Sequence, residues 1–89
     1  MICKVKVISC YALKIVFYLL IKKKYVTYRE LNVVLKVPML YTVLIINKLA
    51  GLGIVKKADF VWGGVRWNVL EEIPTLHELQ SIIMIFEAK

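Results

Sequence analysis

Few side chains of this 89-residue sequence could carry out covalent or metal chemistry. The candidates are two cysteines, Cys3 and Cys10, and the single histidine, His77, which could serve as metal ligands or nucleophiles. Their spacing does not match a zinc site, whose ligands come in closely spaced pairs. The segment Gly51–Gly53 is too short to cradle a phosphate as glycine-rich nucleotide-binding loops do. We therefore expect no catalytic residue, no cofactor and no metal site, and hence no enzyme.

The charged side chains indicate binding rather than catalysis. The chain holds 13 Lys and Arg against 6 Asp and Glu, and residues 1–70 alone carry a net charge of +10. A basic body is typical of proteins that bind polyanions, although a basic balance can also simply keep an apolar protein dissolved. Residues 71–89 carry a net charge of −3, which suggests a different role for this part of the chain.

The hydrophobic content of 61% is high for a chain of this length. The longest run without a charged residue, Val37–Asn47, is well short of the about 20 residues that span a bilayer, so we expect no transmembrane segment. The N-terminus lacks the cleavage site of a signal peptide, which favours a cytoplasmic protein. One small core cannot bury so many apolar side chains, so a second chain is expected to cover some of them. The abundance of Ile, Val and Lys fits a thermophilic source.

The first half of the sequence predicts three helices. Ser9 is placed to cap a first helix that ends at Lys22–Lys24, where positive charge suits the helix C-terminus. Thr27–Glu30 has the pattern of a capping box, which starts a short second helix of about residues 28–35. Pro38 then opens a third helix that continues through Leu49.

The two ends of the sequence predict β-structure and a last helix. Side chains alternate between apolar and polar from Ile2 to Ile8, so residues 1–8 are expected to form a strand or an extension. Residues 54–70 are rich in β-branched and aromatic side chains, and Gly63–Gly64 is a signal for a two-residue hairpin turn. A second capping box, Thr75–Glu78, opens an amphipathic helix within residues 74–89.

This order of helix, short helix, turn, helix and hairpin resembles that of a winged helix-turn-helix domain. The stretch TYRELNVVLKVP (27–38) is similar to the second helix and turn of this family, and NKLAGLGIVKK (47–57) is similar to the end of its recognition helix and the entry to its wing. The resemblance covers roughly residues 9–70 and is strongest to small archaeal and archaeal-virus transcription factors. It implies a single α+β, mostly α-helical domain of residues 1–89, with three helices, a β-hairpin wing and an extra C-terminal helix.

The resemblance also implies a function, which is to bind double-stranded DNA as a transcriptional regulator. The third helix would enter the major groove, and the wing would touch the backbone or the minor groove. Trp62 could stack on a sugar or base, or could instead cover the neighbouring strand. The residues that would contact DNA are Arg29, Lys36, Tyr41, Asn47, Lys48, Lys56, Lys57, Trp62 and Arg66.

The third helix departs from what a DNA reader needs. Helical spacing places Thr42, Ile45, Ile46 and Leu49 on the face that packs inward. The outer face then carries Leu40, Val43 and Leu44, and only Asn47 and Lys48, with Tyr41 at the side, could pair with a base edge. Two interpretations remain: DNA is held mainly through its phosphates, or the outer face binds a protein partner and the domain is an adaptor in a larger assembly. A third possibility is peripheral binding to a membrane surface.

The last helix is a candidate for self-association. Its apolar residues make a stripe at spacings of three and four, and a symmetric dimer formed there would set two third helices about one DNA turn apart. The alternative is that the helix folds back onto its own domain. The stripe consists of Leu76, Leu79, Ile82, Ile83 and Phe86.

Overall fold

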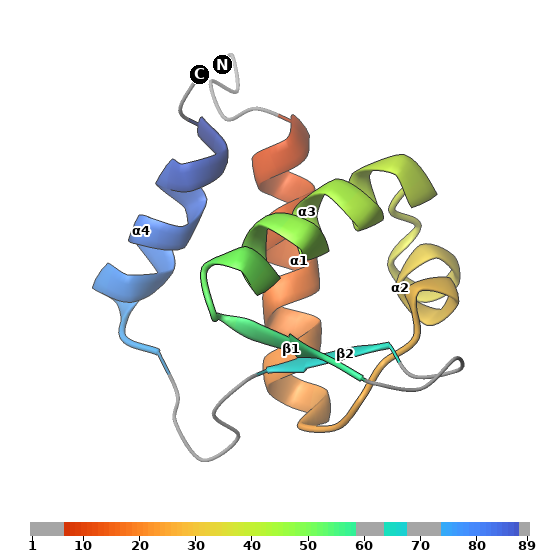
Figure 1. Cartoon of the computed structure of the whole chain (residues 1–89). Coiled ribbons are helices and arrows are strands. Elements are labelled where there is room, and N and C mark those ends of the chain that lie inside the picture. Colours follow the sequence, from red (N-terminus) through yellow and green to blue (C-terminus); the bar gives the residue numbers. More distant parts are fainter. Residues whose placement is uncertain (1–6, 59–63, 68–73, 88–89) are drawn as a thin grey trace.

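The computed structural model describes residues 7–58, 64–67 and 74–87. In these residues the chain is an α+β, mostly helical domain, in an arrangement compatible with a winged helix. Helix α1 is central and contacts α2, α3, α4 and β2. In Figure 1, α3 and the hairpin cross in front of α1, while α4 and α2 lie on either side of it. The elements are α1 (Val7–Lys22), α2 (Tyr28–Leu35), α3 (Met39–Gly51), β1 (Val55–Lys57), β2 (Val65–Trp67) and α4 (Leu76–Glu87).

Helix α1 begins two residues before the predicted cap. The expected strand is wrong at Val7 and Ile8, which are helical, and residues 1–6 lie outside the described part. Ser9 is not an N-cap, because it lies inside α1 and is fully buried. Its hydroxyl donates a hydrogen bond to the carboxylate of Glu87 at the end of α4. Packing against α4 and the core, to which Ile8 contributes, overrides the local alternation.

Helix α2 has the predicted bounds and the predicted start. The amide of Glu30 donates to Oγ1 of Thr27 at 3.0 Å, as in a capping box. The Glu30 carboxylate was predicted to reach back to the Thr27 amide; it accepts a hydrogen bond from the Tyr18 hydroxyl of α1. The turn into α3 is held by Asn32, whose side-chain amide donates to the carbonyl of Val37 at 2.7 Å. These two bonds fix α2 to its neighbours on both sides.

The connection between β1 and β2 is longer than the predicted two-residue turn. Lys57 pairs with Val65 in the antiparallel ladder, and the Ala58 amide donates to the Gly64 carbonyl at 2.9 Å. A two-residue turn at Gly63–Gly64 would instead have paired Trp62 with Val65, so that prediction is wrong. Residues 59–63 of the connection, including Trp62, lie outside the described part of the chain.

The hairpin is joined to the helical body by a bridge between Val26 and Val65. The amide of each donates to the carbonyl of the other, at 2.7 and 2.9 Å. Val26 and Val65 are fully buried, as are the residues of α3 predicted to face inward. The core also includes Ala12, Ile15, Val16, Leu19, Leu31, Val37, Val55 and Trp67.

Helix α4 starts with the predicted capping box and folds back onto its own chain. The Thr75 hydroxyl accepts from the Glu78 amide at 3.2 Å, and the Glu78 carboxylate accepts from the Thr75 amide at 3.1 Å. Ile82 and Phe86 are buried in the core that α1 organises. Two residues of the predicted dimer stripe are therefore already covered within one chain, while Leu76 at the start of α4 is exposed.

Candidate nucleic-acid interface

The outer side of α3 and the hairpin form one surface, which we call the α3–hairpin surface. Because α3 packs its inward face on α1, the opposite face points to solvent. The chain then turns at Gly53, which has a φ of +77°, and the Ile54 amide donates to the Leu49 carbonyl at 3.0 Å. This turn brings β1 next to the end of α3. The residues of the surface are Leu40, Leu44, Asn47, Lys48, Lys56, Lys57 and Arg66.

Two positive residues face each other on the outer side of the hairpin. Lys56 is the ladder partner of Arg66, while the neighbouring pair of Val55 and Trp67 is buried. Side chains alternate between the two faces of a strand, so Lys56 and Arg66 both point outward. Like charges directly opposite one another destabilise a sheet. Two cationic side chains on one face of the hairpin can both contact an anion bound outside it.

Arg66 is held in place on the hairpin. Its Nη1 donates to the Trp67 carbonyl at 2.8 Å, and its guanidinium carbon lies 5.4 Å from the ring centroid of Tyr25. Both contacts restrict the side chain and leave it half-exposed. A guanidinium positioned in this way loses less conformational entropy when it binds a phosphate.

Asn47 and Lys57 contact each other. The Lys57 ammonium donates a hydrogen bond to Oδ1 of Asn47, joining the last turns of α3 to β1. Asn47 was predicted to be the group that reads a base edge, and Lys57 to be a phosphate contact. In the structure these residues interact, so one of the two acceptor positions of Asn47 Oδ1 is occupied by Lys57. Lys48, one residue further along α3, is exposed.

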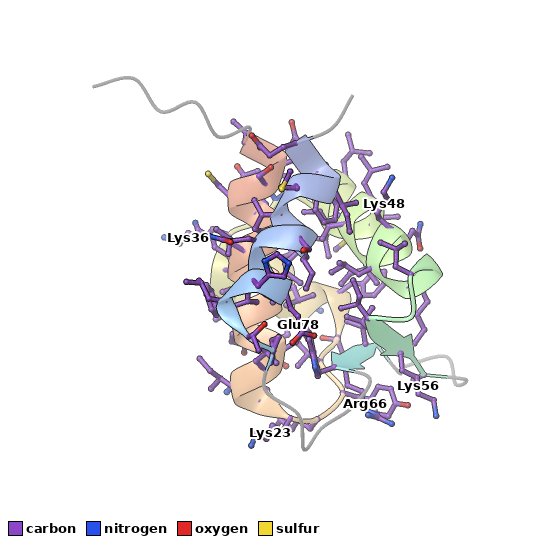
Figure 2. All side chains as sticks on the ribbon, turned by 90° about the vertical axis from the view of Figure 1, so that its left-hand side faces the viewer. Lys23, Lys36, Lys48, Lys56, Arg66 and Glu78 are labelled. Carbon is purple, nitrogen blue, oxygen red and sulfur yellow. The ribbon has the colours of Figure 1, made fainter. Side chains whose placement is uncertain are left out.

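The other predicted DNA contacts are not all on this surface. Figure 2 places Lys48, Lys56 and Arg66 on the side of α3 and the hairpin, and Lys36 on the opposite side. Tyr41 is half-buried and packs on Tyr11 of α1, with ring centroids 5.1 Å apart. It therefore supports the contact between α1 and α3. Arg29 is exposed in the first turn of α2.

The outer face of α3 is apolar, as its sequence predicts. Leu40 is 69% exposed and Leu44 49% exposed, while Val43 is half-buried. Met39, in the first turn, is exposed as well. These side chains can contact thymine methyl groups but cannot form the hydrogen bonds that distinguish most bases. The surface thus combines a basic end with an apolar end.

The electrostatic character of this surface follows from the types of residue in its elements. The described residues of α3, β1 and β2 include no Asp or Glu. Carboxylates lie on the other elements: Glu30 binds Tyr18, Glu87 binds Ser9, and Glu78 caps α4. The hydrogen bond to Glu30 raises the pKa of Tyr18 above 10.0, with further contributions from burial and from the charge of Glu30.

Two arrangements were missed in the sequence. The first is the bond between Tyr18 and Glu30, which has no local signal because it joins two helices. The second is a row of exposed residues on α1 that begins at Val7 and ends at Ile21. Its spacing of three and four residues is a signal that the sequence carries, since it places these residues on one face of the helix.

Among the residues that the structure describes, no helix is long and apolar enough to cross a bilayer. Within the same residues, no three side chains of His, Cys, Asp or Glu gather where they could hold a metal ion. No family model, curated protein or solved structure matches this chain.

Proposed function

We propose that the protein binds double-stranded DNA through the α3–hairpin surface and acts as a transcriptional regulator. The observation that carries this proposal is the pairing of Lys56 with Arg66 on the outer side of the hairpin. Lys57 points to the other face of β1 and contacts Asn47 of α3, and Lys48 is exposed one residue further along that helix. A phosphate bound between Lys56 and Arg66 would contact two cationic side chains at once, and charge-assisted hydrogen bonds of this kind are among the stronger ones.

An extended polyanion fits this surface better than a small one. Lys48 and Lys56 lie on different elements and are separated along the length of the molecule in Figure 2. Duplex DNA supplies phosphates at regular intervals along each strand, and its major groove is wide enough for a helix such as α3. Basic groups on two elements can then be neutralised at the same time.

The composition of α3 argues for weak sequence specificity. Leu40 and Leu44 dominate the exposed face, and the Asn47 amide is engaged by Lys57. Affinity would come mainly from phosphate contacts, which position a protein without reading the sequence. We therefore expect binding to many duplexes with a strong dependence on salt, and preferences that arise from DNA shape.

The test is fluorescence anisotropy of a labelled random-sequence duplex at several salt concentrations. The variant Lys48→Gln/Lys56→Gln should bind more weakly, and the slope of log K against log salt should be shallower by about 1.8, since each lost phosphate contact contributes about 0.9. Lys23→Gln is the matched control, because it removes one charge from the other side of the molecule (Figure 2). Absence of binding at low salt, or an equal effect of the control per charge removed, would refute the proposal.

A second candidate function is supported by the exposure of Leu40 and Leu44. Leu40 and Leu44 lie one turn apart on an exposed helix face, as do the apolar residues by which a helix docks into a groove of a protein partner. In that case the domain is an adaptor, and the basic hairpin serves to keep it dissolved. Leu40→Ser/Leu44→Ser separates the two functions: a modest change in DNA affinity supports DNA binding, while loss of a protein complex or increased solubility supports the adaptor.

Self-association is proposed only for the part of α4 that stays accessible. Ile82 and Phe86 contribute to the core of their own chain, so they cannot pair with a second copy unless α4 detaches. Leu76 is exposed in the first turn, and Ile83 is half-buried. A dimer that sets two α3–hairpin surfaces one DNA turn apart would use this end of α4. Sedimentation of the wild type and of Leu76→Ser tests it.

A further inference from the structure

Helix α1 presents a second exposed face that the DNA-binding proposal does not use. We call it the outer stripe of α1, and its residues follow a spacing of three, four, three and four. This spacing keeps them on one side of the helix, opposite the side that Ile15 and Leu19 bury. The residues of the stripe are Val7, Cys10, Lys14, Phe17 and Ile21, all of them exposed.

The stripe combines large apolar side chains with positive charge. Ile21 is 76% exposed, Val7 58% and Phe17 47%. The whole of α1 contains no acidic residue, while Lys14 lies within the stripe and Lys22 ends the helix. Figure 2 places Lys23 and Lys36 on the side of the molecule away from Lys48 and Lys56.

Within residues 7–58, 64–67 and 74–87, two carboxylates contact α1, and both accept hydrogen bonds from its hydroxyl groups. Glu30 of α2 accepts a hydrogen bond from Tyr18, and Glu87 of α4 accepts one from Ser9. Neither Tyr18 nor Ser9 belongs to the outer stripe. The stripe itself is therefore both apolar and cationic.

Two tyrosines lie along one edge of the stripe. Tyr11 and Tyr18 are half-buried, and each carries a lysine against its ring. The Lys14 ammonium is 5.9 Å from the ring centroid of Tyr11, and the Lys22 ammonium is 5.3 Å from that of Tyr18. The Tyr18 hydroxyl is bound to Glu30 and the Tyr11 ring packs on Tyr41, so the tyrosines border the stripe without being free to move. Long lysines beside them can bury their apolar stems and keep their ammonium groups at the level of lipid headgroups.

A second copy of the chain is a poor occupant for this stripe. Lys14 lies at its centre, so antiparallel pairing about that centre would place Lys14 against Lys14 of the partner copy, and so would parallel pairing in register. Two ammonium groups at the middle of an apolar seam repel each other where water is excluded. The occupant must instead be anionic and must also accept apolar side chains from a convex helix.

We propose that the outer stripe of α1 docks on an anionic lipid bilayer. The helix, about 24 Å long at 1.5 Å per residue, lies in the plane of the membrane. Val7, Phe17 and Ile21 enter the boundary between headgroups and acyl chains, and the Lys14 ammonium stays at the level of the anionic headgroups. The α3–hairpin surface then faces away from the bilayer. This inference does not depend on DNA binding, because the two surfaces lie on opposite sides of α1.

The experiment uses Cys10, which is exposed within the stripe. An environment-sensitive fluorophore is attached to Cys10 in a Cys3→Ser background, and vesicles of phosphatidylcholine with phosphatidylserine are added. The emission should shift to the blue and become stronger, and vesicles of phosphatidylcholine alone should give a much smaller change. A probe on Lys48→Cys, in a background without Cys3 and Cys10, is the control and should not shift.

Unlabelled proteins are compared by flotation with the same vesicles. Phe17→Ser/Ile21→Ser should partition at least about tenfold more weakly, since two large apolar groups no longer leave water. Lys14→Glu is a second variant on the exposed stripe, and it should weaken binding through repulsion by the lipid. Both variants should keep the DNA affinity of the wild type.

Three results would overturn the proposal. The first is failure of the wild type to float with the anionic vesicles. The second is a probe response at Lys48→Cys in place of Cys10, which would assign the membrane contact to the α3–hairpin surface. The third is a change in sedimentation mass on Phe17→Ser/Ile21→Ser, which would show that a second copy covers the stripe.

Discussion

Gly64 lies directly against the backbone of Val26. A Cβ atom on Gly64 would be 2.3 Å from the Val26 carbonyl oxygen and 2.7 Å from its carbonyl carbon. The cause is the bridge between Val26 and Val65, which draws the segment between α1 and α2 onto the hairpin. Gly64 also has a φ of +120°, which side chains of L-residues rarely adopt. The bridge thus attaches the hairpin to the helical body, and the residue next to it, Gly64, has no room for a side chain.

Gly64→Ala should lower the free energy of unfolding by about 2–4 kcal/mol, because the added Cβ clashes with backbone and the backbone conformation is strained. Urea denaturation followed by circular dichroism measures the change. Gly51→Ala is the matched control: Gly51 is the last residue of α3 and has no atom within 4 Å of a built Cβ. It should change stability by less than about 1 kcal/mol. Equal losses in the two variants would contradict the close approach at Gly64.

The sequence identifies this glycine but suggests the wrong reason for it. Two adjacent glycines between β-branched segments are a local signal for a tight turn. The actual constraint on Gly64 is the approach of Val26, which is far away in sequence and is brought there by the fold. A pattern of neighbouring residues cannot reveal such a contact, so both the register of the hairpin and the bridge had to come from the structure.

Helix α4 should be required for the stability of a single chain. Ile82→Ala is expected to cost about 2–4 kcal/mol, because Ile82 is buried in the core; Met84→Ala, at an exposed position of the same helix, should stay within about 0.5 kcal/mol. Unfolding midpoints are measured over a range of protein concentrations. If the midpoint of the wild type rises with concentration and Ile82→Ala removes that dependence, then Ile82 stabilises an interface between chains and not the core of one chain.

The amphipathic pattern of α4 was visible in the sequence, whereas its partner was not. Spacing alone identifies Ile82 and Phe86 as residues that must be covered. It does not distinguish whether a second chain or the first helix of the same chain covers them. The inward face of α3 was predictable in full for a related reason: Thr42, Ile45 and Leu49 repeat with the helical period between clear start and stop signals.

The bond between Tyr18 and Glu30 should appear in the pH dependence of stability. The folded state raises the pKa of Tyr18 above 10.0, first through this hydrogen bond, so it favours the neutral phenol. The contribution to stability is complete below pH 10.0 and is lost as the pH rises through the pKa of the folded state. Tyr18→Phe should therefore reduce the loss of stability at alkaline pH.

Absorbance titration of the phenolate checks the assignment. Subtracting the titration of Tyr18→Phe from that of the wild type leaves the signal of one phenol, which should have a midpoint above 10.0. A midpoint at or below that value would contradict the effect of Glu30. Glu30→Gln keeps the size of the side chain but removes its charge, and it should move the midpoint back toward the ordinary value.

The sequence predicts which types of residue form the candidate site, but it predicts less well which of them lie on the same surface. Lys48, Lys56 and Arg66 were all named from the resemblance, and they share the α3–hairpin side of the molecule in Figure 2. Lys36 is on the opposite side and Tyr41 packs on Tyr11, because the orientation of a side chain depends on how its helix is docked. Charge in a sequence indicates a class of partner, while the surface that meets the partner is a property of packing.

Lys56→Glu should stabilise the fold and weaken DNA binding at the same time. The substitution replaces a pair of like charges across β1 and β2 with a pair of opposite charges, and the free energy of unfolding should rise by about 0.2–1 kcal/mol at low salt. The same change places a carboxylate where a phosphate is expected, so the affinity for a random duplex should fall at least about tenfold. Lys23→Glu makes the same change of charge at the C-terminus of α1, away from the hairpin in Figure 2. It should not raise the free energy of unfolding, because the helix dipole disfavours a carboxylate there, and it should leave DNA affinity nearly unchanged. If Lys56→Glu destabilises the hairpin, or if it leaves DNA affinity unchanged, then the pair of Lys56 and Arg66 is not an anion site.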